Sequence, residues 1–251
     1  MRKPLLVVVC IAAAQVLTCV AAGWAGEEPR EFKLDHFLVY AVKVIGEQPT
    51  ERPPVVQLKG QFDRQPKKAT VNTLTFFANP VSKNGARILD PNAHLAWYAI
   101  TQESEPTRRV EVRNQFGSRK LTIGPAEFLL VPAQKRMEGG QFPSGLDHFK
   151  CYQVLDGKPV DKNVSLKDQF AGDKNVPVLR PRWLAVPVQK TYKEETTKIQ
   201  NKRDHLVVYE IPRKESQKKL VMKDQFGNRR LESGERRFLC VPSTKTVLPA
   251  K

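Results

Sequence analysis

The chain has 251 residues, a formal net charge of +16 and 27% charged residues. Beyond the first 25 residues no apolar segment is long enough to cross a bilayer, which excludes a helical membrane protein. The remaining length fits one large domain or two ordinary ones, and the positive charge favours anionic partners.

Residues 1–25 are predicted to be a secretory signal. Arg2 and Lys3 supply a short positive region, an apolar run follows, and small residues offer cleavage after Ala22 or Ala25. The mature chain is therefore expected to be secreted or periplasmic, and soluble.

Beyond the signal, three motifs recur four times with a period of ~55 residues, which indicates stacked or paired supersecondary units. Each repeat opens with His-x-x-x-Tyr, continues with Gln-Phe, and closes with an apolar run, a proline and a lysine. The opening pairs are His36/Tyr40, His94/Tyr98, His148/Tyr152 and His205/Tyr209. The Gln-Phe pairs begin at Gln61, Gln115, Gln169 and Gln225, and the closing residues are Pro80/Lys83, Pro132/Lys135, Pro187/Lys190 and Pro242/Lys245.

Each repeat is predicted to be a short β-meander. Its first strand is largely apolar on both faces, which is typical of a central strand covered on both sides. A second strand precedes the Gln-Phe turn, a weaker third follows it, and a proline stops the fourth. No part of the mature chain has sustained helical periodicity, so an all-β protein is expected. The first strands are predicted at 37–42, 95–100, 149–154 and 206–211, and the fourth at 76–79, 128–131, 183–186 and 238–241.

The repeats are predicted to act in pairs. The first and third open with Leu-Asp-His-Phe, and the second and fourth with His-Leu. This alternation favours two similar sandwich- or barrel-like domains, at 31–138 and 144–248, joined by the glycine-rich segment 137–145. The alternative is one four-bladed propeller with a blade for each repeat.

The cysteines favour a single disulfide. Cys10 and Cys19 leave with the signal; Cys19 would fit a lipoprotein, but Thr18 is a poor residue before a lipidated cysteine. Cys151 and Cys240 remain, and an even pair in an exported chain predicts that they are bonded to each other.

The motifs resemble a family of exported bacterial domains of unknown function. The matching segments are Asn79 to Gly85, Asp90 to His94, Asp147 to Tyr152 and Leu239 to Lys245. The resemblance implies an extracellular β domain, and it implies no reaction or ligand. Family members tend to carry four cysteines in each pair of repeats, whereas apolar residues replace most of them here.

Two groups of residues are candidates for a site. Four histidines facing a common axis, His36, His94, His148 and His205, could hold Zn or Cu. A structural role at the start of each strand is the favoured interpretation, because duplication of a structural residue gives the same recurrence, and no cofactor is expected. From Lys190 onward there are 16 Lys or Arg and 8 Asp or Glu. A solubilising surface is the favoured interpretation of this charge, and the alternative is an anion site at Arg229, Arg230, Arg236 and Arg237.

The function expected is that of an exported, non-catalytic module that binds an anionic polymer or another cell-surface component. The chain has no Gly-x-Ser-x-Gly, His-Glu-x-x-His or phosphate-loop motif, so an enzyme is not expected. The alternative is a hydrolase acting on polysaccharide through loop carboxylates, for which Glu194-Glu195 in the polar stretch 193–203 is one pair.

Overall fold

The protein is all-β, as predicted, and no helix occurs among the residues described by the computed structural model, which are 31–46, 52–136 and 141–249. The predicted signal, 1–25, lies outside these residues. Likewise, no helix in the described part is both long and apolar enough to span a membrane.

A strand begins at each of the four histidines, as predicted. The prediction of separate third and fourth strands is wrong in the first, second and fourth repeats, where one continuous strand covers both, and it holds only in the third. The last strand of every repeat also runs on past the proline that was expected to stop it, because the outer strands pair with these extensions. The first repeat contains β1 (His36–Ile45), β2 (Val55–Gly60) and β3 (Lys67–Lys83). The second contains β4 (His94–Gln102), β5 (Arg108–Asn114) and β6 (Gly117–Arg136). The third contains β7 (His148–Val154), β8 (Lys162–Lys167), β9 (Gly172–Val178) and β10 (Pro181–Tyr192), followed by the short β11 (Glu195–Thr197). The fourth contains β12 (His205–Lys214), β13 (Lys219–Asp224) and β14 (Gly227–Val247).

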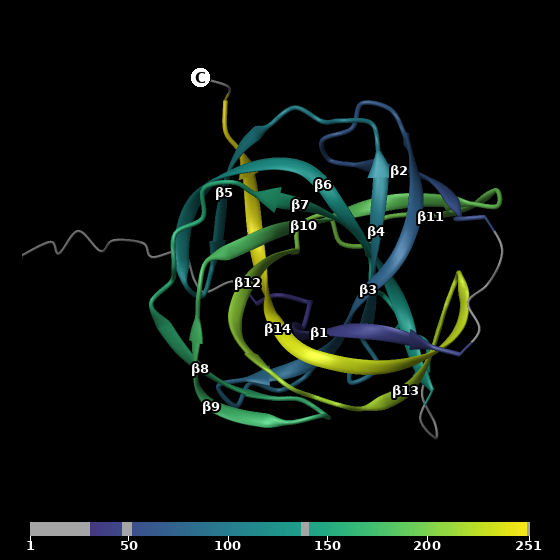
Figure 1. Ribbon diagram of the computed structural model, residues 1–251. Coiled ribbons are helices and arrows are strands. Elements are labelled where there is room, and N and C mark those ends of the chain that lie inside the picture. Colours follow the sequence, from purple (N-terminus) through teal and green to yellow (C-terminus); the bar gives the residue numbers. More distant parts are fainter. Residues whose placement is uncertain (1–30, 47–51, 137–140, 250–251) are drawn as a thin grey trace, which may run out of the picture. The chain divides into compact units, whose positions relative to one another are not determined.

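The first and last strands of the repeats pair in a continuous antiparallel circuit. Its order is β1, β14, β12, β10, β7, β6, β4 and β3, and β3 pairs with β1 again. Each first strand therefore lies between the last strand of its own repeat and the last strand of the preceding one. Figure 1 shows these strands following one another around the molecule.

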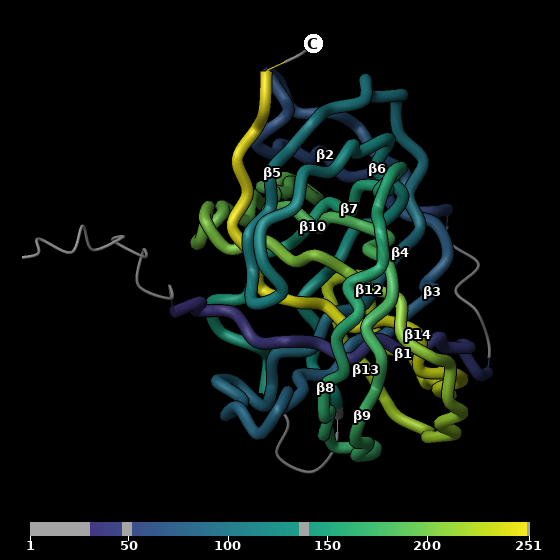
Figure 2. Tube along the Cα trace, turned by 90° about the vertical axis from the view of Figure 1, so that its left-hand side faces the viewer, coloured from purple at the N-terminus to yellow at the C-terminus, as the bar shows by residue number. Residues whose placement is uncertain are grey.

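The second strands interlock the repeats on the outside of this circuit. Each pairs with the end of a last strand two repeats away: β2 with β10, β5 with β14, β8 with β3, and β13 with β6. In Figure 2, β8 and β9 run side by side along the outside of the molecule.

The prediction of two separate domains at 31–138 and 144–248 is corrected by this pairing, because Phe32–Lys251 is one compact unit. The boundary strands pair across the expected division, β6 with β7 and β14 with β1. The propeller alternative is wrong for the same reason, since separate blades would not share these ladders.

The first strands are buried on both faces, which confirms their predicted central position. Alternate side chains of β1 enter different apolar clusters: Phe37 and Val39 pack in one, and Leu38 and Tyr40 in the other. The first cluster lies within the circuit of strands, and the second lies between the circuit and the outer strands. The ends of the first strands, where the histidines lie, are therefore fixed by packing from both sides.

Candidate functional site

Three of the four repeated tyrosines bond to the turn before a Gln-Phe pair two repeats away. We call the place where each of the four repeated tyrosines meets the Gln-Phe turn of the repeat two away a tyrosine station. The Tyr40 hydroxyl donates to Asp168 at 2.9 Å, and the Tyr98 hydroxyl donates to Asp224 at 2.5 Å. At the third station, the Asn114 amide donates to the Tyr209 hydroxyl at 3.0 Å. The stations thus tie the first and third repeats together, and likewise the second and fourth.

The phenylalanine of each Gln-Phe pair completes a station by meeting the tyrosine edge-on. Such edge-to-face contacts contribute about 0.5–1.5 kcal/mol beyond the burial of apolar area. The ring centroids are separated by 5.1 Å for Phe170 and Tyr40, 5.2 Å for Phe226 and Tyr98, 5.4 Å for Phe116 and Tyr209, and 5.2 Å for Phe62 and Tyr152.

Three of the closing lysines, Lys83, Lys135 and Lys245, lie over these phenylalanines. The ammonium of Lys135 is 4.6 Å from the centre of Phe170, and that of Lys245 is 4.6 Å from the centre of Phe62. Burial lowers the pKa of both lysines to about 8. Three of the four stations therefore collect side chains from three repeats.

The histidines lie one to a repeat, each at the start of a first strand. Burial, together with the charge of Lys135, lowers the pKa of His94 to about 3, and its ring stacks on Phe77 with centroids 5.4 Å apart. Burial and Lys190 likewise lower the pKa of His148 to about 3.

The histidines at the other two repeats also serve as strand starts. His36 has its pKa lowered to about 4 by burial and by Lys83, and its Nε2 lies 2.6 Å from the Gln115 amide. His205 is buried at the start of β12. A lysine beside an imidazole repels a cation, and no group of three metal-ligating side chains occurs within the described ranges. The Zn or Cu alternative gains no support here.

Two of the arginines predicted to bind anions are committed to carboxylates within the fold. Arg229 donates to the Tyr98 hydroxyl at 2.9 Å and pairs with Asp224 at 3.5 Å. Arg236 is buried and pairs with Asp173. These two side chains stabilise the interlock of the repeats.

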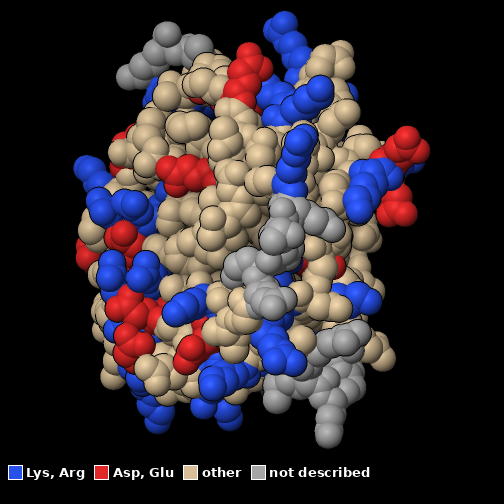
Figure 3. Space-filling view, turned by 45° about the vertical axis from the view of Figure 1, so that its right-hand side comes forward, with Lys and Arg blue, Asp and Glu red and all other residues tan. Residues whose placement is uncertain are grey.

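The other two predicted arginines do not make a strong positive surface. Arg237 pairs with Glu235 at 2.8 Å, and Arg230 is exposed. Figure 3 shows Lys and Arg interspersed with Asp and Glu over the face in view. The predicted set of four therefore spans different environments and does not form one shaped site.

The disulfide expected between Cys151 and Cys240 is not formed, because both are free, buried thiols. The expectation assumed that β14 returns to the first strand of its own pair of repeats. In the structure Cys240 lies opposite Phe37 on β1, and Cys151 lies opposite Phe128 on β6. Strands β10 and β12 lie between the two cysteines along the circuit, and both thiols belong to the same buried apolar cluster. Burial raises the pKa of each thiol.

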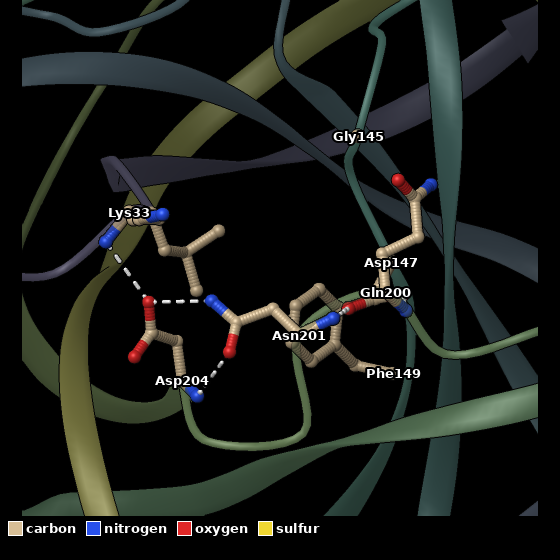
Figure 4. Close-up of a pocket in the computed structure, with 8 residues that line it drawn as sticks. Lys33, Gly145, Asp147, Phe149, Gln200, Asn201 and Asp204 are labelled. Carbon is tan, nitrogen blue, oxygen red and sulfur yellow. Dashed lines mark hydrogen bonds between the residues drawn. The ribbon is translucent and has the colours of Figure 1, made fainter.

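A small pocket of about 210 Å³ lies where the first strands begin, and sequence reasoning did not find it. In Figure 4 the Asp204 carboxylate bridges the backbone amide of Lys33, at 2.9 Å, and the side-chain amide of Asn201, at 2.7 Å. The Gln200 side chain lies on the other side, beside Gly145. The only hint in the sequence is the aspartate that precedes three of the four histidines.

These aspartates fix loops. Asp147 accepts the backbone amides of Gln200 and Asn201, at 2.8 and 2.9 Å. Asp147 and Asp204 line the same pocket, yet each is bonded to the backbone. The other candidate carboxylates, Glu194 and Glu195, are exposed at the turn into β11. The hydrolase alternative stays a prediction.

One ionic cluster was also missed, although its lysine stands in an otherwise apolar strand position. Lys150 is fully buried on β7, and its ammonium lies 2.9 Å from both Asp63 and Glu105. Lys67 contacts the same Glu105 oxygen at 3.3 Å. This cluster joins the first three repeats.

A circuit of strands with recurrent contacts between opposite repeats defines an all-β protein of interlocked repeats. The chain belongs to the family described as a repeat of unknown function (DUF7450), whose model matches residues 94–242, from the histidine of the second repeat to the closing proline of the fourth. No curated protein and no solved structure matches the chain.

Proposed function

We propose that the protein is an exported, non-catalytic module that binds a cell-surface component through the loops at the start of its first strands. The observation that carries this proposal is the engagement of the recurrent tyrosine, phenylalanine and lysine side chains in the stations. Because these residues hold the repeats together, recognition is assigned to the loops between the strands. Binding residues commonly lie on loops that a rigid scaffold positions.

The pocket at Lys33 and Gln200 indicates the size of the group that would be recognised. A volume of about 210 Å³ is below the roughly 300–1,000 Å³ of sites that enclose a whole drug-sized ligand. It suits one polar unit of a larger polymer. The exposed Lys33 and Gln200 side chains would contact that unit, while Asp147 and Asp204 hold the loops. The net charge of +16 favours an anionic polymer.

Arrays of glycans and polyanions, probed with the protein lacking residues 1–25 at low and high salt, test this proposal. Gln200→Trp would fill the pocket, and Gln217→Trp is the matched control, because Gln217 lines a different hollow. We expect binding that weakens with salt and is lost in Gln200→Trp alone. If neither substitution changes binding, the site lies elsewhere on the molecule. If no polymer binds at low salt, the proposed polymer-binding role is contradicted.

A further inference from the structure

The station of Tyr152 differs from the other three. Gly60 stands where the others have Asp168, Asp224 or Asn114, so the turn offers no side chain to the tyrosine. Tyr152 is 1% exposed, and its hydroxyl has no hydrogen-bond partner among the described residues. Burying a hydroxyl without a hydrogen-bond partner costs free energy of folding, so the Tyr152 hydroxyl is expected to bond to a group other than a turn side chain.

Charged groups are buried at the same place. Lys150 stands where the other first strands have Leu38, Ala96 and Val207. Its ammonium donates to Asp63 Oδ2 and Glu105 Oε1, both at 2.9 Å. The three side chains are 0–1% exposed, so their remaining polar atoms have no access to bulk solvent.

Two further oxygens of this cluster, Asp63 Oδ1 and Glu105 Oε2, have no donor partner among the described residues, and the two carboxyl groups are close enough to interact with each other. Together with the Tyr152 hydroxyl, they present two acceptors and one donor. A water molecule has the complementary set, with two hydrogens to donate and lone pairs to accept. We propose that this station holds one buried water, which donates to Asp63 and Glu105 and accepts from Tyr152.

The chemistry favours water over a metal cation. The Lys150 ammonium already contacts both carboxylates and would repel a second positive charge at short range. A water with three polar partners is typical of buried waters in globular proteins. The water would do for Tyr152 what a carboxylate or amide side chain does at the other stations.

A high-resolution crystal structure of the protein without residues 1–25 tests the proposal directly. We expect one density peak within hydrogen-bonding distance of all three oxygens. The proposal is overturned if no peak lies within hydrogen-bonding distance of these three oxygens. It is also overturned if the peak changes when NaCl is exchanged for RbCl, because that would identify a cation.

Magnetic relaxation dispersion of ¹⁷O provides a second test in solution. Tyr152→Phe removes one of the three partners, so the long-lived water should exchange several-fold faster or disappear. Tyr209→Phe is the matched control, since the Tyr209 hydroxyl is already bonded to Asn114. Equal dispersion in the wild type and in Tyr152→Phe would contradict the assignment.

Discussion

The Tyr98 hydroxyl donates to the carboxylate of Asp224 at 2.5 Å, across 126 residues of sequence. The same carboxylate accepts the Phe226 amide and pairs with Arg229. One buried side chain thus fixes a strand of the second repeat, a turn of the fourth and the arginine beside it.

Asp224→Ala should therefore destabilise the protein by about 2–3 kcal/mol, because it leaves the Tyr98 hydroxyl and Arg229 without their buried acceptor. Tyr98→Phe should cost about 1–2 kcal/mol, and the double variant less than the sum of the two. Urea unfolding at neutral pH measures these changes. Additive effects would show that the two groups do not interact.

Lys150→Met should destabilise the protein by about 3–5 kcal/mol, since it leaves the buried Asp63 carboxylate without a cation and Glu105 with Lys67 alone. Lys67→Met is the control. The Lys67 side chain is 26% exposed, so its loss should cost about 1 kcal/mol or less. Similar unfolding midpoints for the two variants would contradict the central role given to Lys150.

Stability should fall as the pH is lowered from 7 to 5. The pKa values of His94 and His148 are about 3 in the folded protein, below the ordinary 6.5, so the unfolded chain binds more protons in this range. Burial raises the pKa of Asp35 and Asp147, which favours the folded state in more acidic solution, so the histidine effect is cleanest above pH 5. Urea unfolding across this range should give a shallower slope for His94→Gln than for the wild type.

The two halves should fold only together. Because β6 pairs with β7 and β14 with β1, segments 26–138 and 139–251 each lack half of the strand circuit. Co-expressed, they should form a 1:1 complex with the far-ultraviolet circular dichroism of the intact protein. A single half that is monomeric and unfolds cooperatively would restore the two-domain interpretation.

Cys151 and Cys240 should resist thiol reagents in the native protein, because both are buried and burial raises the pKa of each thiol. In the protein lacking residues 1–25, which retains only these two cysteines, titration with a colorimetric disulfide reagent should find two thiols in denaturant and none without it. Titration of fewer than two thiols in denaturant under non-reducing conditions would show that the disulfide forms after all.

The sequence alone determined the β class, the positions of the four first strands and the recurrence of the residues that build the stations, whereas the last strands extend past their predicted ends. It did so because strand patterns and turn residues are local features that one segment displays by itself. The choice of partner for each strand was decided only by the tertiary structure. A first strand such as β1, apolar on both faces, is equally compatible with the last strand of its own pair of repeats and with that of the next. The roles of Lys150, Asp63 and Glu105 likewise depend on contacts between distant segments, which periodicity does not encode.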